Sequence, residues 1–333
     1  MSNFLDPAIL FFVFGLFAGL CRSNLEIPPP IARFLSLYLL MALGLKGGFA
    51  LAESGLSREV VTGLLCAVIL AIVVPSIGYM VLRRWLNGFD AAAIAATYGS
   101  VSAVTFITAV QYLDNRGVEF GGHMAAAMAL MESPAIILAV VLANRARKHG
   151  AAPAATAGSR GAEVAIANTP LSKILHESLT DGAQMLLLGA MLVGLLTGES
   201  GQAAMQPFAV DLFKGMLAFF LLDMGLLAAR NMGELRGKSL WLLAYAIVGP
   251  LVHATLALSM AWMFGLSAGD GALLMVLAAS ASYIAVPAVV RHAIPEANPS
   301  LFIGMSLGLT FPFNILLGIP LYTNVAATLL GTP

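Results

Sequence analysis

Residues 91–113 read AAAIAATYGSVSAVTFITAVQYL, an apolar run long enough to cross a lipid bilayer, since a spanning helix needs about 20 residues. The middle of the run gathers small and hydroxylated residues, namely Gly99, Ser100, Ser102 and Thr105. Such residues favour helix ends over helix interiors. The stretch therefore predicts a membrane helix that is broken in its middle. Ordinary packing of small residues against a neighbouring helix is the alternative interpretation.

A similar stretch follows about 180 residues later. There Ser280, Ser282 and Tyr283 lie in the run ASASY, and Pro287 follows. A proline removes a backbone donor and frees the carbonyl four residues earlier, which here belongs to Tyr283. Broken helices in matching places of two repeats indicate the substrate site of a transporter. The N-termini of half-helices attract anions, whereas freed carbonyls and hydroxyls suit Na⁺.

The composition excludes most classes of soluble protein. The chain has 333 residues, of which 59% are hydrophobic and only 10% are charged. A water-facing globule needs about 25% charged residues to cover its surface. The 17 Lys and Arg balance the 17 Asp and Glu, so no excess of positive charge exists for binding nucleic acid. These numbers indicate a polytopic membrane protein.

Ten apolar segments can be read along the chain. They cover about 7–22, 31–52, 60–82, 91–113, 122–143, 176–197, 208–229, 239–264, 271–290 and 299–321. The polar stretch 144–175 separates five segments from five, and we interpret it as a linker. The predicted fold is all-α, with ten membrane helices arranged as two five-helix repeats, 1–143 and 176–333.

The second repeat is predicted to enter the membrane in the opposite direction, because each repeat has an odd number of spans. Thirteen of the 17 Lys and Arg residues fall in segments on the same side of the membrane as the linker. Three fall on the opposite side, and Lys46 lies inside a span. Positive residues favour the cytoplasmic side. We therefore expect the inner membrane of a bacterium, a cytoplasmic linker and both termini outside.

Polar residues in two further spans are candidate site residues. Glu132 precedes Ser133 and Pro134 in the fifth segment, and Thr310 and Asn314 flank Pro312 in the tenth. Carboxylates inside a membrane span are functional candidates, although a purely structural hydrogen bond is the alternative for Glu132.

Lys46 lies in the second segment and Asp223 in the seventh, its counterpart in the second repeat. Because an unpaired charge is costly inside the bilayer, we expect the two side chains to form an ion pair. The pair would be either structural or a coupling element. The alternative for Lys46 is that its ammonium extends to the outer membrane surface.

Several motifs resemble the sodium-dependent bicarbonate transporter (SbtA-type) family. They are Val101-Ser102 with Thr105, Gly117-Val-Glu119, Ala278-Ala-Ser-Ala-Ser282, Ile294-Pro-Glu-Ala-Asn-Pro-Ser300, Gly318-Ile-Pro-Leu-Tyr322 and Gly233-Glu-Leu-Arg236. The resemblance covers nearly the whole chain apart from a shorter linker. It implies Na⁺-coupled bicarbonate uptake, a core domain and a gate domain, a homotrimer, and a PII-like regulatory partner in the cytoplasm.

The resemblance also implies site residues and some departures. Ser102, Thr105, Ser280 and Ser282 match polar residues of the family's crossing region, and Glu132 stands where the cyanobacterial members carry Asp. Tyr283 replaces an acidic residue, while Ala285 and Val104 replace serines, so the site is less hydroxylated here.

We therefore predict a secondary transporter of a small anion, most simply bicarbonate, with Na⁺ as the coupling ion and no other cofactor. Two alternatives remain open: a permease for another small anion, and a membrane sensor that binds without transport. No catalytic constellation is visible, so we expect no enzyme.

Overall fold

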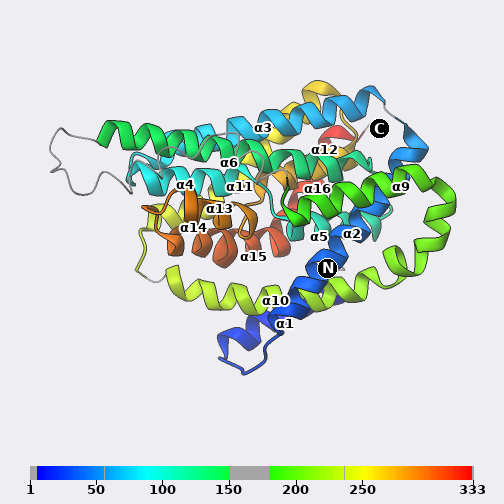
Figure 1. The fold of residues 1–333 in the computed structure, drawn as a ribbon, viewed down its shortest axis with the longest axis horizontal. Coiled ribbons are helices and arrows are strands. Elements are labelled where there is room, and N and C mark those ends of the chain that lie inside the picture. Colours follow the sequence, from blue (N-terminus) through cyan, green and yellow to red (C-terminus); the bar gives the residue numbers. More distant parts are fainter. Residues whose placement is uncertain (1–5, 56, 151–179, 236, 332–333) are drawn as a thin grey trace.

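The computed structural model describes residues 6–55, 57–150, 180–235 and 237–331. These residues form helices and contain no strand, as the sequence predicts (Figure 1). Most of the predicted linker, 144–175, lies outside the described residues. Its first residues continue the preceding helix to Gly150, beyond the boundary predicted at 143.

The helices of the first half begin and end close to the predicted segments. They are α1 (Pro7–Leu20), α2 (Pro29–Ser54), α3 (Arg58–Leu82), α4 (Gly88–Gly99), α5 (Ala103–Asp114) and α6 (His123–Gly150). The predicted fourth segment is thus two helices, separated by 100–102.

The second half contains a similar series of helices. They are α9 (Gly182–Gln206), α10 (Phe213–Met232), α11 (Leu240–Phe264), α12 (Ala268–Ala279), α13 (Ala285–Ala293), α14 (Pro299–Met305), α15 (Phe311–Phe313) and α16 (Ile319–Leu330). Short π-helical turns, η2 (Pro207–Asp211), η4 (Ser306–Thr310) and η5 (Asn314–Gly318), and the 3₁₀ turn η3 (Gly233–Leu235), connect some of them.

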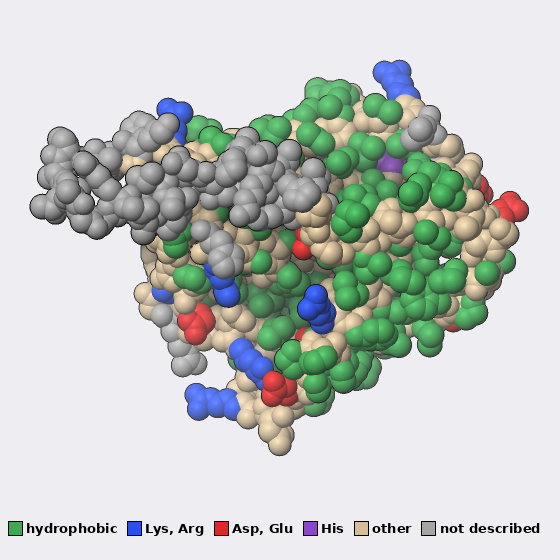
Figure 2. All heavy atoms as spheres, in the orientation of Figure 1, with side chains coloured by type: hydrophobic (Ala, Val, Ile, Leu, Met, Phe, Trp, Pro, Cys, Tyr) green, Lys and Arg blue, Asp and Glu red, His purple; other side chains and the backbone are tan. Residues whose placement is uncertain are grey.

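Seven helical stretches among the described residues are long and apolar enough to cross a membrane. One of them, 182–235, contains both α9 and α10, while α1 and α12 are shorter apolar helices. Large apolar side chains such as Leu196, Leu240 and Trp262 are 72–80% exposed. Figure 2 shows apolar side chains over much of the face that is not grey. Such a surface is suited to lipid rather than water.

Polar side chains fix the starts of many helices. Asp6, Asn87, Ser102, Asp181 and Asn298 each accept a hydrogen bond from a backbone N–H in the first turn of the helix that follows. These caps satisfy donors that have no partner inside the helix. The local sequence thus explains where the helices begin, including the half-helix α5.

Four helices pack in two similar pairs, α1 with α10 and α2 with α9. Glycines make the close approach possible in both pairs. A Cβ atom added at Gly15 would lie 2.2 Å from the carbonyl oxygen of Leu222, and one at Gly48 would lie 2.1 Å from that of Met191. We call α1, α2, α9 and α10 the four-helix group; α1 and α10 lie along the lower edge of Figure 1.

The remaining helices pack around the two breaks, and two aspartates hold their connections in related ways. Asp90, in the first turn of α4, accepts a hydrogen bond of 2.7 Å from the backbone N–H of Asn298. Asp270, in the first turn of α12, accepts one of 2.7 Å from that of Gly121. In both cases the donor stands just before a helix of the other half, α14 or α6, so each half anchors the other.

Candidate functional site

The two broken helices meet. The backbone N–H of Ser102 donates to Ser280 Oγ at 3.0 Å, and that of Ser282 donates to the carbonyl oxygen of Thr97 at 2.8 Å. The connecting residues are extended, as at Ser100 (φ −98°, ψ −175°) and Ser280 (φ −80°, ψ 167°). The structure therefore brings together the two segments that the sequence singled out.

A cavity of about 230 Å³ lies beside this crossing, between the four-helix group and the other helices. Four of the predicted site residues line it: Ser102, Glu132, Ser282 and Tyr283. The other lining residues are Ser36, Leu40, Val101, Ala103, Val104, Met128, Ala129, Ile136, Asp181, Ala183, Gln184, Leu187, Ile284, Ala285, Ala288 and Val289.

The N-termini of both half-helices α5 and α13 reach this cavity. Ala103 and Val104 begin α5, Ala285 begins α13, and all three line the wall. The first N–H groups of a helix have no partner within it and carry the positive end of the helix dipole.

In α5 the Thr105 N–H is already bonded to Ser102 Oγ. In α13 the Val286 N–H is bonded to Ser282 Oγ, while Pro287 has no N–H. The remaining N–H groups and the two positive dipole ends that face one cavity suit an anion.

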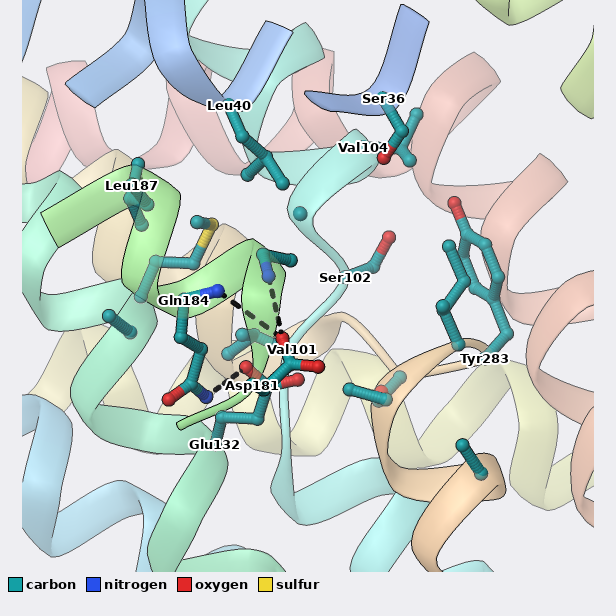
Figure 3. A pocket seen from close by; sticks show the side chains of 18 of the residues that line it. Ser36, Leu40, Val101, Ser102, Val104, Glu132, Asp181, Gln184, Leu187 and Tyr283 are labelled. Atoms are coloured by element: carbon teal, nitrogen blue, oxygen red, sulfur yellow. Dashed lines mark hydrogen bonds between the residues drawn. The ribbon is translucent and has the colours of Figure 1, made fainter. Parts of the chain in front are cut away.

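Polar side chains from α6 and α9 form the opposite part of the wall (Figure 3). Gln184 Nε2 donates a hydrogen bond to Glu132 Oε2. Asp181 caps α9 by accepting from the backbone N–H groups of Ala183 at 3.0 Å and Gln184 at 3.2 Å. The described lining residues include no Lys or Arg, so the only side-chain charges at the cavity are carboxylates.

Sequence analysis missed the polar residues Ser36, Asp181 and Gln184. Asp181 stands directly before Gly182, where α9 begins, so its capping position could have been recognised as a helix start. Ser36 and Gln184 are single polar residues in apolar helices, and nothing in the sequence says which helix faces they occupy.

Other predicted site residues support the crossing from behind the cavity wall. Ser280 Oγ accepts from Ser102 and donates to the carbonyl oxygen of Leu277 at 2.9 Å, so its hydroxyl is fully used. Thr105 donates to Ser102 Oγ through its backbone N–H and its hydroxyl. At Gly99, an added Cβ would lie 2.5 Å from Pro75. Ser100 Oγ is buried without a partner among the described residues.

Thr310 and Asn314 also lie away from the cavity lining. Asn314 Nδ2 donates to the carbonyl oxygen of Ala279 at 2.8 Å, which holds the last turn of α12. Thr310 Oγ1 donates to the carbonyl oxygen of Ala246 at 2.6 Å. Pro250 lies four residues further along α11 and cannot donate to that carbonyl, so Thr310 supplies the missing bond.

Thr310→Val is expected to lower stability by at least about 2 kcal/mol, because the Ala246 carbonyl and the Tyr98 hydroxyl, 2.6 Å from Thr310 Oγ1, would both lose their buried partner. Thr310→Ser keeps the hydroxyl, so its stability should be close to that of the wild type. Thermal unfolding of the purified variants in detergent measures the difference. Equal midpoints for the two variants would contradict this structural role.

The expected Lys46–Asp223 ion pair is wrong. Lys46 Nζ lies 3.1 Å from Asp114 Oδ2 at the end of α5, and 4.6 Å from the centre of the Phe213 ring. Phe213 begins α10, and Asp223 lies ten residues further, about 15 Å along that helix. The predicted repeat matches Asp223 with Ala42, one helical turn from Lys46, but Lys46 lies beside the first residue of α10, whereas Asp223 lies in the middle of that helix.

The Lys46–Asp114 pair is partly exposed, with 25% and 35% of the side chains accessible. A double-mutant cycle of Lys46→Met and Asp114→Asn should therefore give a coupling energy of no more than about 1 kcal/mol. The same cycle with Asp223→Asn in place of Asp114→Asn should give none. Coupling between Lys46 and Asp223 that exceeds the Asp114 value would contradict the observed pairing.

The chain can be compared with known proteins on this basis. Curated proteins give no significant match. The sequence model of one family, the Na⁺-dependent bicarbonate transporter superfamily, matches residues 7–327. That range includes both half-helices and every residue that lines the cavity. With this match over nearly its whole length, the chain belongs to the Na⁺-dependent bicarbonate transporter superfamily.

Proposed function

We propose that this protein is a secondary transporter that imports bicarbonate together with Na⁺ by alternating access. The observation that carries the proposal is the cavity bounded by the N-termini of both half-helices. These termini offer their first N–H groups, at Ala103, Val104 and Ala285, and positive dipole ends to a small anion without any cationic side chain among the described lining residues. Membership of the superfamily supports bicarbonate as that anion.

The proposed architecture is ten spans in two inverted repeats. Related contacts in the two halves support it: α1 packs on α10 as α9 packs on α2, and Asp90 and Asp270 each anchor a connection of the other half. Counting α4 with α5, α12 with α13, and α14–α16 as single spans gives five per repeat. An odd number per repeat inverts the second copy.

The four-helix group is the proposed gate domain, and the remaining helices form the proposed core domain. Both contribute to the cavity, the first through Leu40 and Leu187 and the second through Ser102 and Tyr283. A second cavity of about 830 Å³ adjoins the other end of α5, where Lys46 and Asp114 line it. Movement of the core domain against the gate domain would expose the crossing of the two half-helices to each side of the membrane in turn.

For the coupling ion we propose Glu132 as a cation-binding group. Its side chain lines the cavity, and Gln184 donates to only one of its carboxylate oxygens by a described hydrogen bond. A carboxylate oxygen is a suitable ligand for Na⁺ and unsuitable for an anion. Glu132→Gln should therefore raise the Na⁺ concentration that half-saturates transport more than it changes the apparent affinity for bicarbonate.

We place the protein in the inner membrane of a bacterium, with the linker in the cytoplasm and both termini outside, as a homotrimer regulated by a PII-like protein. Thirteen Lys and Arg residues on the linker side of the membrane support the orientation.

In a Cys21→Ser background, a cysteine at Ala155 should resist an impermeant thiol reagent in intact cells. A cysteine at Glu119, on the other side, should be labelled; the reverse pattern would invert the orientation.

The proposed activity can be tested with purified protein in proteoliposomes. An inward Na⁺ gradient should drive uptake of ¹⁴C-bicarbonate, and K⁺ in place of Na⁺ should not. Binding without flux would support a sensor instead, and uptake that K⁺ sustains equally well would remove Na⁺ coupling.

A further inference from the structure

We infer that the cavity accepts a broader class of substrate than bicarbonate, namely small monocarboxylates with a short alkyl group. The inference rests on the proposed anion site and extends it: bicarbonate would be the smallest member of a series that shares one carboxylate head. The carboxylate would lie at the N-termini of the two half-helices. The alkyl group would lie among Leu40, Met128 and Leu187.

The cavity is larger than bicarbonate needs. Its volume is about 230 Å³. Bicarbonate has four non-hydrogen atoms and fills roughly the space of two water molecules, or about 60 Å³ at about 30 Å³ per water. The remaining volume would hold several methylene groups. The cavity is not closed on all sides, so a substrate longer than bicarbonate could extend from the crossing along the apolar wall.

The two sides of the cavity carry different kinds of polar group. Ser102 and the helix N-termini can donate hydrogen bonds to an anion, whereas Glu132, Asp181 and Gln184 lie on the same side of Ser102 as the apolar Leu40 and Leu187 (Figure 3). All three bicarbonate oxygens need hydrogen-bond partners when they leave water. A carboxylate needs them at one end only, and its alkyl group gains from apolar walls. Each buried methylene should tighten binding about fourfold.

The charges restrict the class further. Glu132 and Asp181 line the cavity, and its described lining includes no Lys or Arg. A second carboxylate on the substrate would find no cationic partner and would be repelled by both side chains. The site should therefore accept monocarboxylates and reject dicarboxylates of the same length.

Binding is the suitable measurement, because protonated short-chain acids cross bilayers unaided. Isothermal titration of the protein in nanodiscs with acetate, propionate, butyrate and pentanoate should show affinity rising about fourfold per methylene until the cavity is filled. Succinate should not bind. Empty nanodiscs correct for partition of the acids into lipid.

Two variants locate the alkyl group. Ala183→Leu fills space one helical turn from Leu187, and Ala129→Leu fills space beside Met128 should the first variant fail to fold. Either variant should weaken the binding of pentanoate at least tenfold, while the affinities for acetate and bicarbonate should change little. Gly189→Ala is the matched control on α9, because a Cβ there meets no atom within 4 Å.

The outcomes separate this inference from the proposed function. Na⁺-driven bicarbonate uptake with no monocarboxylate binding, or with affinity independent of chain length, would overturn the inference and leave the function standing. Chain-length-dependent binding without flux of any anion would overturn the transport function and support the inference. Absence of both binding and bicarbonate flux would overturn both.

Discussion

Gly48→Val is expected to prevent α2 and α9 from packing, with a loss of stability of about 3 kcal/mol or more. A Cβ at this position would lie 2.1 Å from the carbonyl oxygen of Met191 and 2.8 Å from the backbone nitrogen of Leu195. Both are backbone atoms of α9, so the helices must separate instead of a side chain moving aside. The yield of folded protein on size-exclusion chromatography and its thermal midpoint measure the effect.

Gly189→Ala is the matched control for this prediction. It lies on α9 as well, with no atom near the added Cβ. Alanine is favoured over glycine in a helix by about 1 kcal/mol, so this variant should be neutral or slightly stabilised. A Gly48→Val protein as stable as the Gly189→Ala protein would mean that the helices do not approach as the structure places them.

Ser102→Ala and Ser282→Ala are expected to weaken bicarbonate binding ten- to a hundredfold each, without loss of the fold. Both side chains line the cavity. Ser102 Oγ accepts hydrogen bonds from Thr105, and Ser282 Oγ accepts one of 3.2 Å from the backbone N–H of Val286. Each hydroxyl proton can therefore be donated to the anion, and a hydrogen bond to a charged group contributes about 1.5–3 kcal/mol.

Concentration-dependent ¹⁴C-bicarbonate uptake measures this loss, and thermal unfolding measures the separate cost of losing each cap, about 1 kcal/mol. Ser259→Ala is the control, since this serine is exposed on α11 and bonds only to Thr255 of the same helix in the described structure. Wild-type affinity and rate in both cavity variants would place the anion elsewhere.

Sequence reasoning located the two breaks because their signals are local. Ser102 caps α5 through its own side chain, and the apolar residues around it need no distant partner to form helices. The same locality made the cavity residues Ser282 and Tyr283 recognisable, since they lie in the short connection between α12 and α13. Repetition of the pattern at one spacing then indicated that the two breaks act together.

The roles of the other hydroxyls could not be predicted in this way. Ser280 and Ser100 occupy matching places in the two stretches, yet Ser280 Oγ is used in internal hydrogen bonds and Ser100 Oγ is buried without a partner among the described residues. Thr310 resembled a site residue, but it serves a carbonyl that Pro250 frees on another helix. A serine or threonine has one proton to donate, and the acceptor can be a nearby carbonyl, as for Ser280, or a distant one, as for Thr310.

The sequence by itself determined the membrane location, the helices, their caps and the two breaks, because hydrophobic length and capping are properties of neighbouring residues. Only the tertiary structure decided which helices pair and in which register along their axes they pack. This register places Lys46 beside Asp114 instead of Asp223, and it brings Gln184 into hydrogen-bonding distance of Glu132. Such contacts depend on close approach at glycines such as Gly48, where a shift of one helical turn, about 5.4 Å, replaces every partner.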